Sequence, residues 1–346
     1  YPRVKFWHDS LTELKQDLVS QDKTLVIRRG KPVRVLREIV EEVGADTVYY
    51  NRDYSPYARK RDKTIEKKVD VDFRTFKDLV LFEKREILTN SGGPYKVYTY
   101  YAKKWFDRQK PRTQETESYT VPGVHSRDIP TVGDLGFEKP EGMEVWDGGR
   151  KNGRRRLEDF KSLIGEYDES RDYPARDATS GISPHLRFGT VSVREAFWAA
   201  EEAKEDQSEG GVRAWQEQLA WRDFYFQVLW NWPETTHKPF LEQYRSIDWK
   251  TDKTSEEWDK LKRGKTGYPF VDAGMRELKH SGWMHNRLRM VVASFASKDL
   301  HIDWKLVHEY FKRSFVDAEV SAMVGGIQWA YSIGTDAQPY FRVFNP

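Results

Sequence analysis

The sequence predicts an α/β domain followed by an all-α domain, and three observations support that division. Residues 24–50 run as strand, helix and strand, an order that implies a right-handed crossover in a parallel sheet. From Leu157 onward nearly every segment has the spacing of a helix, and none alternates as a strand does. A length of 346 residues is sufficient for two domains that each bury a core.

The α/β domain is expected at residues 1–105. Residues 24–28 form a short apolar run typical of a buried strand, and the apolar positions of 33–40 recur at helical spacing. We expect that helix to end near Gly44, because glycine is favoured just after a helix. Residues 46–50 should then form the next strand.

A connector is expected at residues 106–150, which are rich in proline, glycine, threonine and charge without sustained periodicity. The basic run that follows, 151–156, resembles a solvated helix start, with contact to DNA phosphates as the alternative. It lacks the Gly-Lys-Ser/Thr ending of a phosphate-binding P-loop.

The helical domain is expected at residues 151–346. Ser192 to Glu195 predicts a capping box, and Asp303 precedes another amphipathic segment. Ser183 is the expected N-cap of a helix with Pro184 at its first position, where free backbone N–H groups could bind an anion. Helices of these lengths can enclose a cofactor.

Composition excludes several classes of function. The net charge is only +3, so nucleic acid would have to bind a local basic face. The absence of cysteine excludes disulfides, thiolate zinc sites and cysteine nucleophiles, and fits an intracellular, cytoplasmic protein. The histidines have no metal-ligand spacing, so no metal site is expected. No apolar run approaches the length of a membrane span, and 13 tryptophans indicate stacking surfaces.

Polar and apolar side chains divide residues 286–295 between two helical faces. One face carries Asn286, Arg289 and Met290, and the other is apolar. Trp283 flanks the polar face so closely that we expect part of it to lie in a pocket, where buried polar atoms require partners. The alternative is an ordinary solvated face of an amphipathic helix.

The segments 266–278 (TGYPFVDAGMREL), 281–291 (SGWMHNRLRMV) and 325–346 closely resemble the catalytic domain of the photolyase and cryptochrome family, above all class I cyclobutane pyrimidine dimer (deoxyribodipyrimidine) photolyases. The likeness covers residues 2–346. Relatives extend beyond both ends, so we expect a chain truncated at both ends, with a Rossmann-like sheet that lacks its first strands.

The resemblance implies that FAD is the cofactor. Residues 51–57 resemble an antenna loop, but the Asn-Glu pair that some relatives use for folate is absent at 57–58, so the identity of any second chromophore stays open. Asp317 and Arg289 are expected to pair. The positions that match FAD-binding residues of the family are Tyr167, Thr179, Ser180, Gly181, Ile182, Ser183, Trp215, Arg222, Asn286, Arg289, Asp317, Glu319 and Met323.

The resemblance also implies a substrate, a cyclobutane pyrimidine dimer in UV-damaged DNA. A lesion inside the duplex cannot reach a buried cofactor, so the damaged bases must be flipped out. The positions that match catalytic residues are Gln218, Trp221, Asn286, Met290 and Trp329. The positions that match DNA-binding residues are Arg171, Gln218, Trp221, Asn286, Arg287, Met290 and Trp329.

Three positions depart from class I photolyases. Gln218 replaces a glutamate that can hydrogen-bond to the dimer, and Met323 replaces an asparagine that faces the flavin. Ile327 replaces the first tryptophan of the electron relay, which breaks the link to Trp304 and Trp249. Tyr331 and Trp329 are candidate substitutes for the missing tryptophan.

These features predict light-driven repair, in which photoexcited reduced FAD donates an electron to the dimer. The alternatives are a cryptochrome-like photoreceptor, a DNA-binding flavoprotein without repair activity, and a (6-4) photolyase. A monomer without membrane contact is expected. The lesion-pocket residues favour repair, whereas the three departures favour a changed role.

Overall fold

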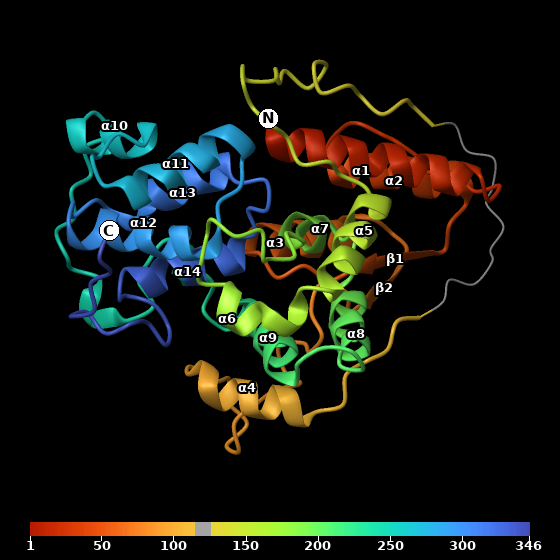
Figure 1. Cartoon of the computed structure of the whole chain (residues 1–346). Coiled ribbons are helices and arrows are strands. Elements are labelled where there is room, and N and C mark those ends of the chain that lie inside the picture. The colour runs from red at the N-terminus through yellow and green to blue at the C-terminus, as the bar shows by residue number, and fades with distance from the viewer. Residues whose placement is uncertain (115–125) are drawn as a thin grey trace.

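The computed structural model describes residues 1–114 and 126–346, and it shows a small α/β part beside a larger helical part (Figure 1). The elements of the N-terminal third are α1 (Pro2–Val19), α2 (Pro32–Val43), β1 (Thr47–Asn51), α3 (Pro56–Lys68), β2 (Asp72–Phe76) and α4 (Tyr98–Asp107). The helices that follow are α5 (Arg150–Lys161), η1 (Ile164–Glu166), α6 (Tyr167–Ser170), α7 (Ser183–Phe188), α8 (Val193–Ala203), α9 (Glu209–Asn231), η2 (Pro233–Thr236), η3 (Glu242–Tyr244), α10 (Glu256–Arg263), α11 (Pro269–Ser281), α12 (Asn286–Lys298), α13 (Trp304–Ser314) and α14 (Val320–Ala330).

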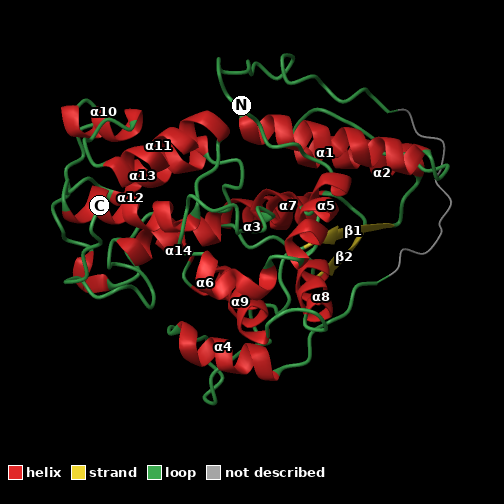
Figure 2. Cartoon of the chain, in the orientation of Figure 1, coloured by secondary structure: helices red, strands yellow, loops and turns green. Residues whose placement is uncertain are grey.

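The α/β part contains a two-stranded parallel sheet, drawn in yellow in Figure 2. Thr47 pairs with Asp72 and Asn51 with Phe76, and α3 makes the crossover between β1 and β2. The predicted fold class, a parallel α/β part followed by a helical domain, is therefore confirmed. The strand expected at 46–50 is β1, displaced by one residue.

The strand expected at 24–28 is wrong. The N–H of Ile27 donates to the Ser126 hydroxyl at 3.0 Å, and its carbonyl accepts from the N–H of Arg127. These residues run beside 126–127 and not beside a strand, so no ladder forms.

The helix predicted next is α2, and Gly44 ends it with a φ of 64°, a left-handed conformation that glycine adopts without strain. The middle of the expected connector, residues 115–125, lies outside the described residues.

Helix α1 packs on the helical part, an arrangement that the sequence did not indicate. The ring of Phe6 is fully buried and lies 4.9 Å from the ring of His185 and 5.2 Å from that of Phe188, both in α7. Burial also lowers the pKa of His185 to about 4, so this ring is neutral at physiological pH.

Two of the three predicted helix caps are confirmed. Ser192 and Glu195 form the reciprocal capping box of α8, and Asp303 caps α13 by accepting from the N–H of Lys305. The predicted N-cap at Ser183 is wrong, because Ile182 is the N-cap of α7 and Ser183 is its first residue.

The basic run at 151–156 forms the first half of α5, as a helix start should. Arg154 pairs with Glu195 at 3.2 Å, and Arg150, one residue before the run, pairs with the same carboxylate at 2.5 Å. These ion pairs join α5 to α8, which supports a structural role for this end of the run.

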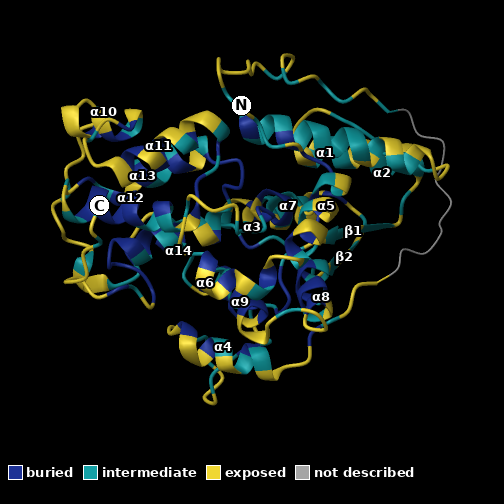
Figure 3. Ribbon diagram, in the orientation of Figure 1, coloured by how far each residue is buried: buried dark blue, intermediate teal, exposed yellow. Residues whose placement is uncertain are grey.

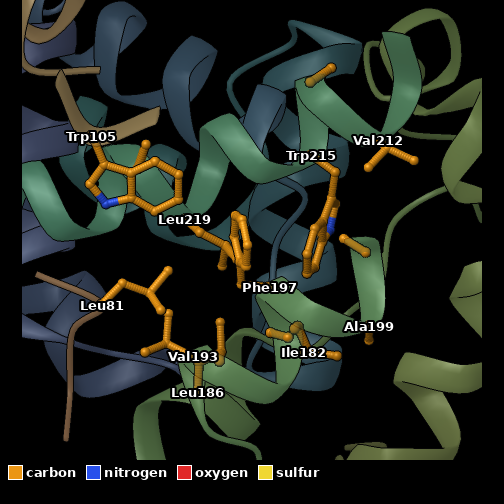
Figure 4. Packing of buried hydrophobic residues seen from close by; sticks show 14 of the residues in the cluster. Leu81, Trp105, Ile182, Leu186, Val193, Phe197, Ala199, Val212, Trp215 and Leu219 are labelled. Atoms are coloured by element: carbon orange, nitrogen blue, oxygen red, sulfur yellow. The ribbon is translucent and has the colours of Figure 1, made fainter. Parts of the chain in front are cut away.

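Helix α9 is the centre of the helical part and has buried residues along its length. It contacts α4, α6, α8 and α14. Figure 3 shows buried residues in dark blue, clearly visible in α8 and α12. Figure 4 shows part of the main hydrophobic cluster, in which Trp215 and Leu219 of α9 lie with Phe197 of α8 and Trp105 of α4. No helix in the described ranges is long and apolar enough to cross a membrane.

Asp223 of α9 joins the α/β part and α4 to this core. One carboxylate oxygen accepts from the N–H groups of Leu81 and Phe82 at 3.0 and 3.1 Å and from the Trp105 indole at 3.0 Å. The side chain is fully buried, and that burial raises the pKa of Asp223 to about 6. A single carboxyl group thus satisfies three buried donors from two separate segments.

Candidate cofactor and substrate site

A cavity of about 520 Å³ lies at the centre of the helical part, with walls from α6, α7, α9, α12 and α14. It brings together residues that are up to 162 positions apart, from Tyr167 to Trp329. The predicted site residues on its wall are Tyr167, Arg171, Thr179, Ser183, Gln218, Trp221, Arg222, Asn286, Arg287, Arg289, Met290, Asp317, Glu319, Met323, Ile327 and Trp329. The cofactor set and the substrate set therefore share one enclosure.

Four predicted cofactor residues lie behind this wall. Trp215 is buried in the core, where its indole N–H donates to the Ser180 hydroxyl at 3.4 Å. Ile182 is buried as the N-cap of α7. Gly181 has a φ of 60°, and a side chain there would meet the Trp146 ring at 3.0 Å. These residues shape the turn that presents Thr179 and Ser183 to the cavity.

The predicted pair between Asp317 and Arg289 is present. Their side chains meet at 2.8 Å, and the Ser183 hydroxyl donates to the same oxygen of Asp317 at 2.6 Å. The second oxygen of Asp317 is buried and has no hydrogen-bond partner among the described residues. Leaving a buried acceptor without a hydrogen bond costs free energy. This oxygen is therefore a ready acceptor for a further donor.

Glu319 takes a different role from Asp317. Its carboxylate accepts from the N–H groups of Ser321 and Ala322 at 3.0 and 2.9 Å, so it caps α14. This contact fixes the helix that carries Met323 and Ile327 along the cavity wall.

The indole of Trp221 is held from behind by Tyr98, a residue that sequence reasoning missed. The two rings stack at 3.6 Å with an angle of 11°. Tyr98 donates its hydroxyl to the Glu217 carbonyl at 3.0 Å, and its backbone N–H donates to Asp336 at 3.0 Å. One face of Trp221 is therefore covered, so a ligand in the cavity would have to stack on the opposite face.

The start of α12 supplies the polar end of the cavity. The N–H of Arg287 donates to the His285 ring at 3.1 Å, and the Arg287 guanidinium donates to Asp172 at 2.7 Å. Burial, with Arg287 and Arg289 nearby, lowers the pKa of His285 and favours its neutral form. The Met290 sulfur lies 3.7 Å from the Asn286 amide nitrogen.

Arg222 is less free than the resemblance implies. It lines the cavity, but its guanidinium donates to the backbone carbonyls of Leu79 and Leu186. It thereby links the α/β part to α7, and desolvation of the guanidinium lowers its pKa.

Sequence reasoning missed several lining residues. Those on α14 had a detectable signal, because Ala322 and Gly326 recur at helical spacing with the predicted Met323. Tyr225 had the same signal in α9, at helical spacing from the predicted Trp221 and Arg222. Ala293 shares the helical face expected for Asn286, Arg289 and Met290, and it lines the cavity. The missed residues are Leu186, Arg187, Glu217, Tyr225, His285, Phe311, Phe315, Ala318, Ala322 and Gly326.

The relay positions lie in the second core cluster. Ile327 is buried at the cavity wall, and Trp304 is buried in the same hydrophobic cluster. Trp249 packs edge-on against Tyr331 at 5.4 Å. The Tyr331 hydroxyl donates to the carbonyl of Ile302 at 3.1 Å, and burial raises its pKa. A carbonyl is a poor base, so the phenol cannot readily lose its proton on oxidation, and Tyr331 is a weak substitute for the missing tryptophan.

Replacing Ile327 with tryptophan should accelerate blue-light photoreduction of oxidised flavin by several-fold, because it places an oxidisable ring between the cavity and Trp304. The check is the rate of flavin bleaching under constant illumination with an external reductant. Ile327→Phe is the matched control, because it adds an aromatic ring that is hard to oxidise. Equal rates for the tryptophan variant and the unmodified protein would contradict the broken relay.

The residues of this cavity fit FAD. The described wall carries five arginines against three carboxylates, a balance suited to a pyrophosphate, and it adds aromatic surface for ring systems. The free oxygen of Asp317 offers an acceptor to a cofactor N–H. A volume of 520 Å³ is within the range of cofactor sites.

The α/β part, the helical domain and the aromatic cavity together define a protein that can hold a cofactor among its helices. Comparison with known proteins identifies the family. Residues 215–346 match the FAD binding domain of DNA photolyase, and residues 2–118 match the DNA photolyase domain. The chain belongs to the DNA photolyase family.

Several relatives support this assignment. The deoxyribodipyrimidine photo-lyase of Halobacterium salinarum is 40% identical over the whole chain and 74% of its own length. The Escherichia coli photo-lyase is 34% identical over 91% of the chain and 67% of its length. A class III photolyase structure from Agrobacterium tumefaciens matches with a TM-score of 0.92 at 33% identity, over 99% of this chain and 73% of that one.

A cryptochrome structure from Synechocystis matches with a TM-score of 0.85 at 24% identity, over 99% of this chain and 74% of that one, which shows the shared fold alone. The structure of a Sulfolobus tokodaii photolyase with two FAD molecules matches with a TM-score of 0.82 at 29% identity, over 100% of this chain and 74% of that one.

Proposed function

We propose that this protein splits cyclobutane pyrimidine dimers in UV-damaged DNA, using light and reduced FAD. The observation that carries the proposal is the single cavity in which Trp221, Trp329 and Gln218 face the same space as Asp317 and Arg289. The relatives named deoxyribodipyrimidine photo-lyase support it.

Bound in the cavity, reduced FAD supplies the electron that enters the dimer after light absorption. The chain supplies binding and orientation. The free face of Trp221 stacks on a flipped-out base, and the Gln218 amide keeps one N–H for a base carbonyl while its other N–H donates to Ala214 at 3.0 Å. The Asp317–Arg289 pair fixes the cofactor end of the cavity.

Contact with the DNA backbone is assigned to Arg171 and Arg287 at the cavity wall. Arg287 is held by Asp172, so its guanidinium is positioned before the substrate arrives. We also propose that the protein acts as a monomer, inside the cell, at sites of damage. A second chromophore is compatible with the proposal and is not assigned a chemical identity.

The test is dimer splitting on UV-irradiated oligothymidine, with chemically reduced protein and blue light. We expect pyrimidine absorbance near the thymine band to recover under light and to stay constant in the dark. Unirradiated oligothymidine is the matched substrate control. Protein that holds about one FAD, is fully reduced and splits no dimer would contradict the proposal.

Trp221→Ala should weaken binding to dimer-containing DNA by roughly tenfold to a hundredfold, because stacking contributes about 1–3 kcal/mol per base. Trp221→Phe should retain most of the affinity, since it keeps a ring against Tyr98. Fluorescence anisotropy with labelled oligonucleotide measures both. Equal affinities for the alanine variant and the unmodified protein would remove Trp221 from the lesion site.

A second candidate, a cryptochrome-like flavoprotein without repair, is favoured by one observation. The three departures from class I photolyases, Gln218, Met323 and Ile327, all lie on the cavity wall. The splitting assay separates the two, because a receptor would hold flavin and leave the dimer intact.

A further inference from the structure

A third carboxylate on the cavity wall, that of Glu217, is left unused by the site described above. Asp317 is committed to Arg289 and Ser183, and Glu319 caps α14. Among the described residues, the carboxylate of Glu217 has a single ionic partner, Arg213, at the long distance of 3.7 Å.

The turn that carries Glu217 is nevertheless fixed. Its backbone carbonyl accepts from the Tyr98 hydroxyl, and Tyr98 stacks on Trp221. Arg213 lies 3.1 Å over the Phe106 ring, which holds that guanidinium back against α4. The Glu217 side chain is 40% exposed, so its carboxylate is hydrated and accessible to a ligand in the cavity.

A carboxylate at this place opposes DNA binding in general, because it repels phosphates. It can favour one class of ligand, a base with an exposed N–H, because an ionised carboxylate only accepts hydrogen bonds. A flipped-out thymine presents such an N–H on its Watson–Crick edge, between two carbonyls. Next to Glu217, the Gln218 amide has an N–H that suits one of those carbonyls.

We propose that Glu217 is a specificity-determining residue that contacts the lesion, its carboxylate accepting the imide N–H of a pyrimidine in the dimer. The inference rests on the proposed function. Repulsion of phosphates lowers the affinity for all DNA, whereas attraction of the imide acts only on the flipped-out dimer and so raises the ratio of affinities for damaged over undamaged DNA. Glu217 thus places a carboxylate at the cavity wall, one residue before Gln218 in the sequence.

The test compares Glu217→Met, which has no acceptor oxygen, with the unmodified protein, measuring dark binding of short labelled oligothymidine with and without one cyclobutane dimer. We expect the ratio of the two affinities to fall about tenfold, as expected for one lost base-edge contact. Glu209→Met is the matched control, because Glu209 is an exposed residue of the same helix and does not line the cavity. The control should leave the ratio unchanged.

A substrate change identifies the atom involved. A dimer methylated at N3 lacks the imide N–H, so it should lose about tenfold in affinity with the unmodified protein and nothing further with Glu217→Met, as in a double-mutant cycle. This comparison remains informative if the variant folds poorly. If N3 methylation leaves the affinity of the unmodified protein unchanged, the inference is overturned.

Dimer splitting is measured on the same samples. If the unmodified protein splits the dimer and Glu217→Met keeps the full affinity ratio, the inference is wrong and the proposed function stands. If the reduced, flavin-loaded unmodified protein splits no dimer, the proposed function fails and the inference fails with it.

Discussion

Replacing Asp317 with alanine should yield a folded protein that has lost most of its flavin. The change removes the partner of Arg289 and of the Ser183 hydroxyl, and leaves a guanidinium at the cavity wall without its counter-charge. Breaking a buried ion pair costs about 3–5 kcal/mol, which corresponds to at least a hundredfold loss if it falls mainly on the cofactor-bound state. The ratio of flavin to protein absorbance after gel filtration, followed by titration with FAD, measures the effect.

Two variants separate this effect from general instability. Asp317→Asn keeps an oxygen that can accept from Arg289, so it should retain more flavin than the alanine variant. Glu195→Ala breaks the ion pairs between α5 and α8, away from the cavity, and should lower stability without changing flavin content. Normal flavin affinity in Asp317→Ala would contradict the assigned role.

The Asp317–Arg289 pair shows what the sequence could predict about the site. Both residues lie in segments with specific family likeness, and charge complementarity in a desolvated place leaves few alternatives. The N-cap prediction at Ser183 was wrong because its hydroxyl is used by Asp317, 134 residues away. Local capping rules contain no information on such a partner.

The contact between Tyr98 and Trp221 shows why part of the site could not be predicted. The two rings stack across 123 residues, and nothing in the local sequence of α4 indicates it. Helix α9 posed a related difficulty, because its buried residues lie on nearly all sides. Without one apolar stripe, helical periodicity cannot separate core positions such as Trp215 from cavity positions such as Gln218.

The fold also has parts that the sequence could predict and parts that it could not. The helix α2 was predictable, because apolar spacing and Gly44 give concordant signals. The apolar run at 24–28 was interpreted as a strand because composition alone does not show whether a neighbouring strand exists. Its actual neighbour is the segment at 126–127, nearly a hundred residues later.

Asp223→Leu should produce the largest loss of stability, about 3–5 kcal/mol, because it leaves three buried donors without an acceptor. Those donors are the N–H groups of Leu81 and Phe82 and the indole of Trp105. The free energy of unfolding from urea titration of the flavin-loaded protein measures the loss. A change below about 1 kcal/mol would mean that water or a rearranged loop satisfies these donors.

Asp223→Asn tests the charge separately from the acceptor, because its amide oxygen can still accept from all three donors. Burial raises the pKa of Asp223 from its ordinary 3.8 to about 6, so the folded state favours the protonated acid. That preference is fully present below pH 3.8 and is lost as the pH rises to 6, at a cost of up to about 3 kcal/mol for a shift of this size. The asparagine variant carries no such group. Its stability relative to the unmodified protein should therefore increase between pH 4 and pH 6.5 and level off above, and a pH-independent difference would show that Asp223 is ionised in the folded protein throughout that range.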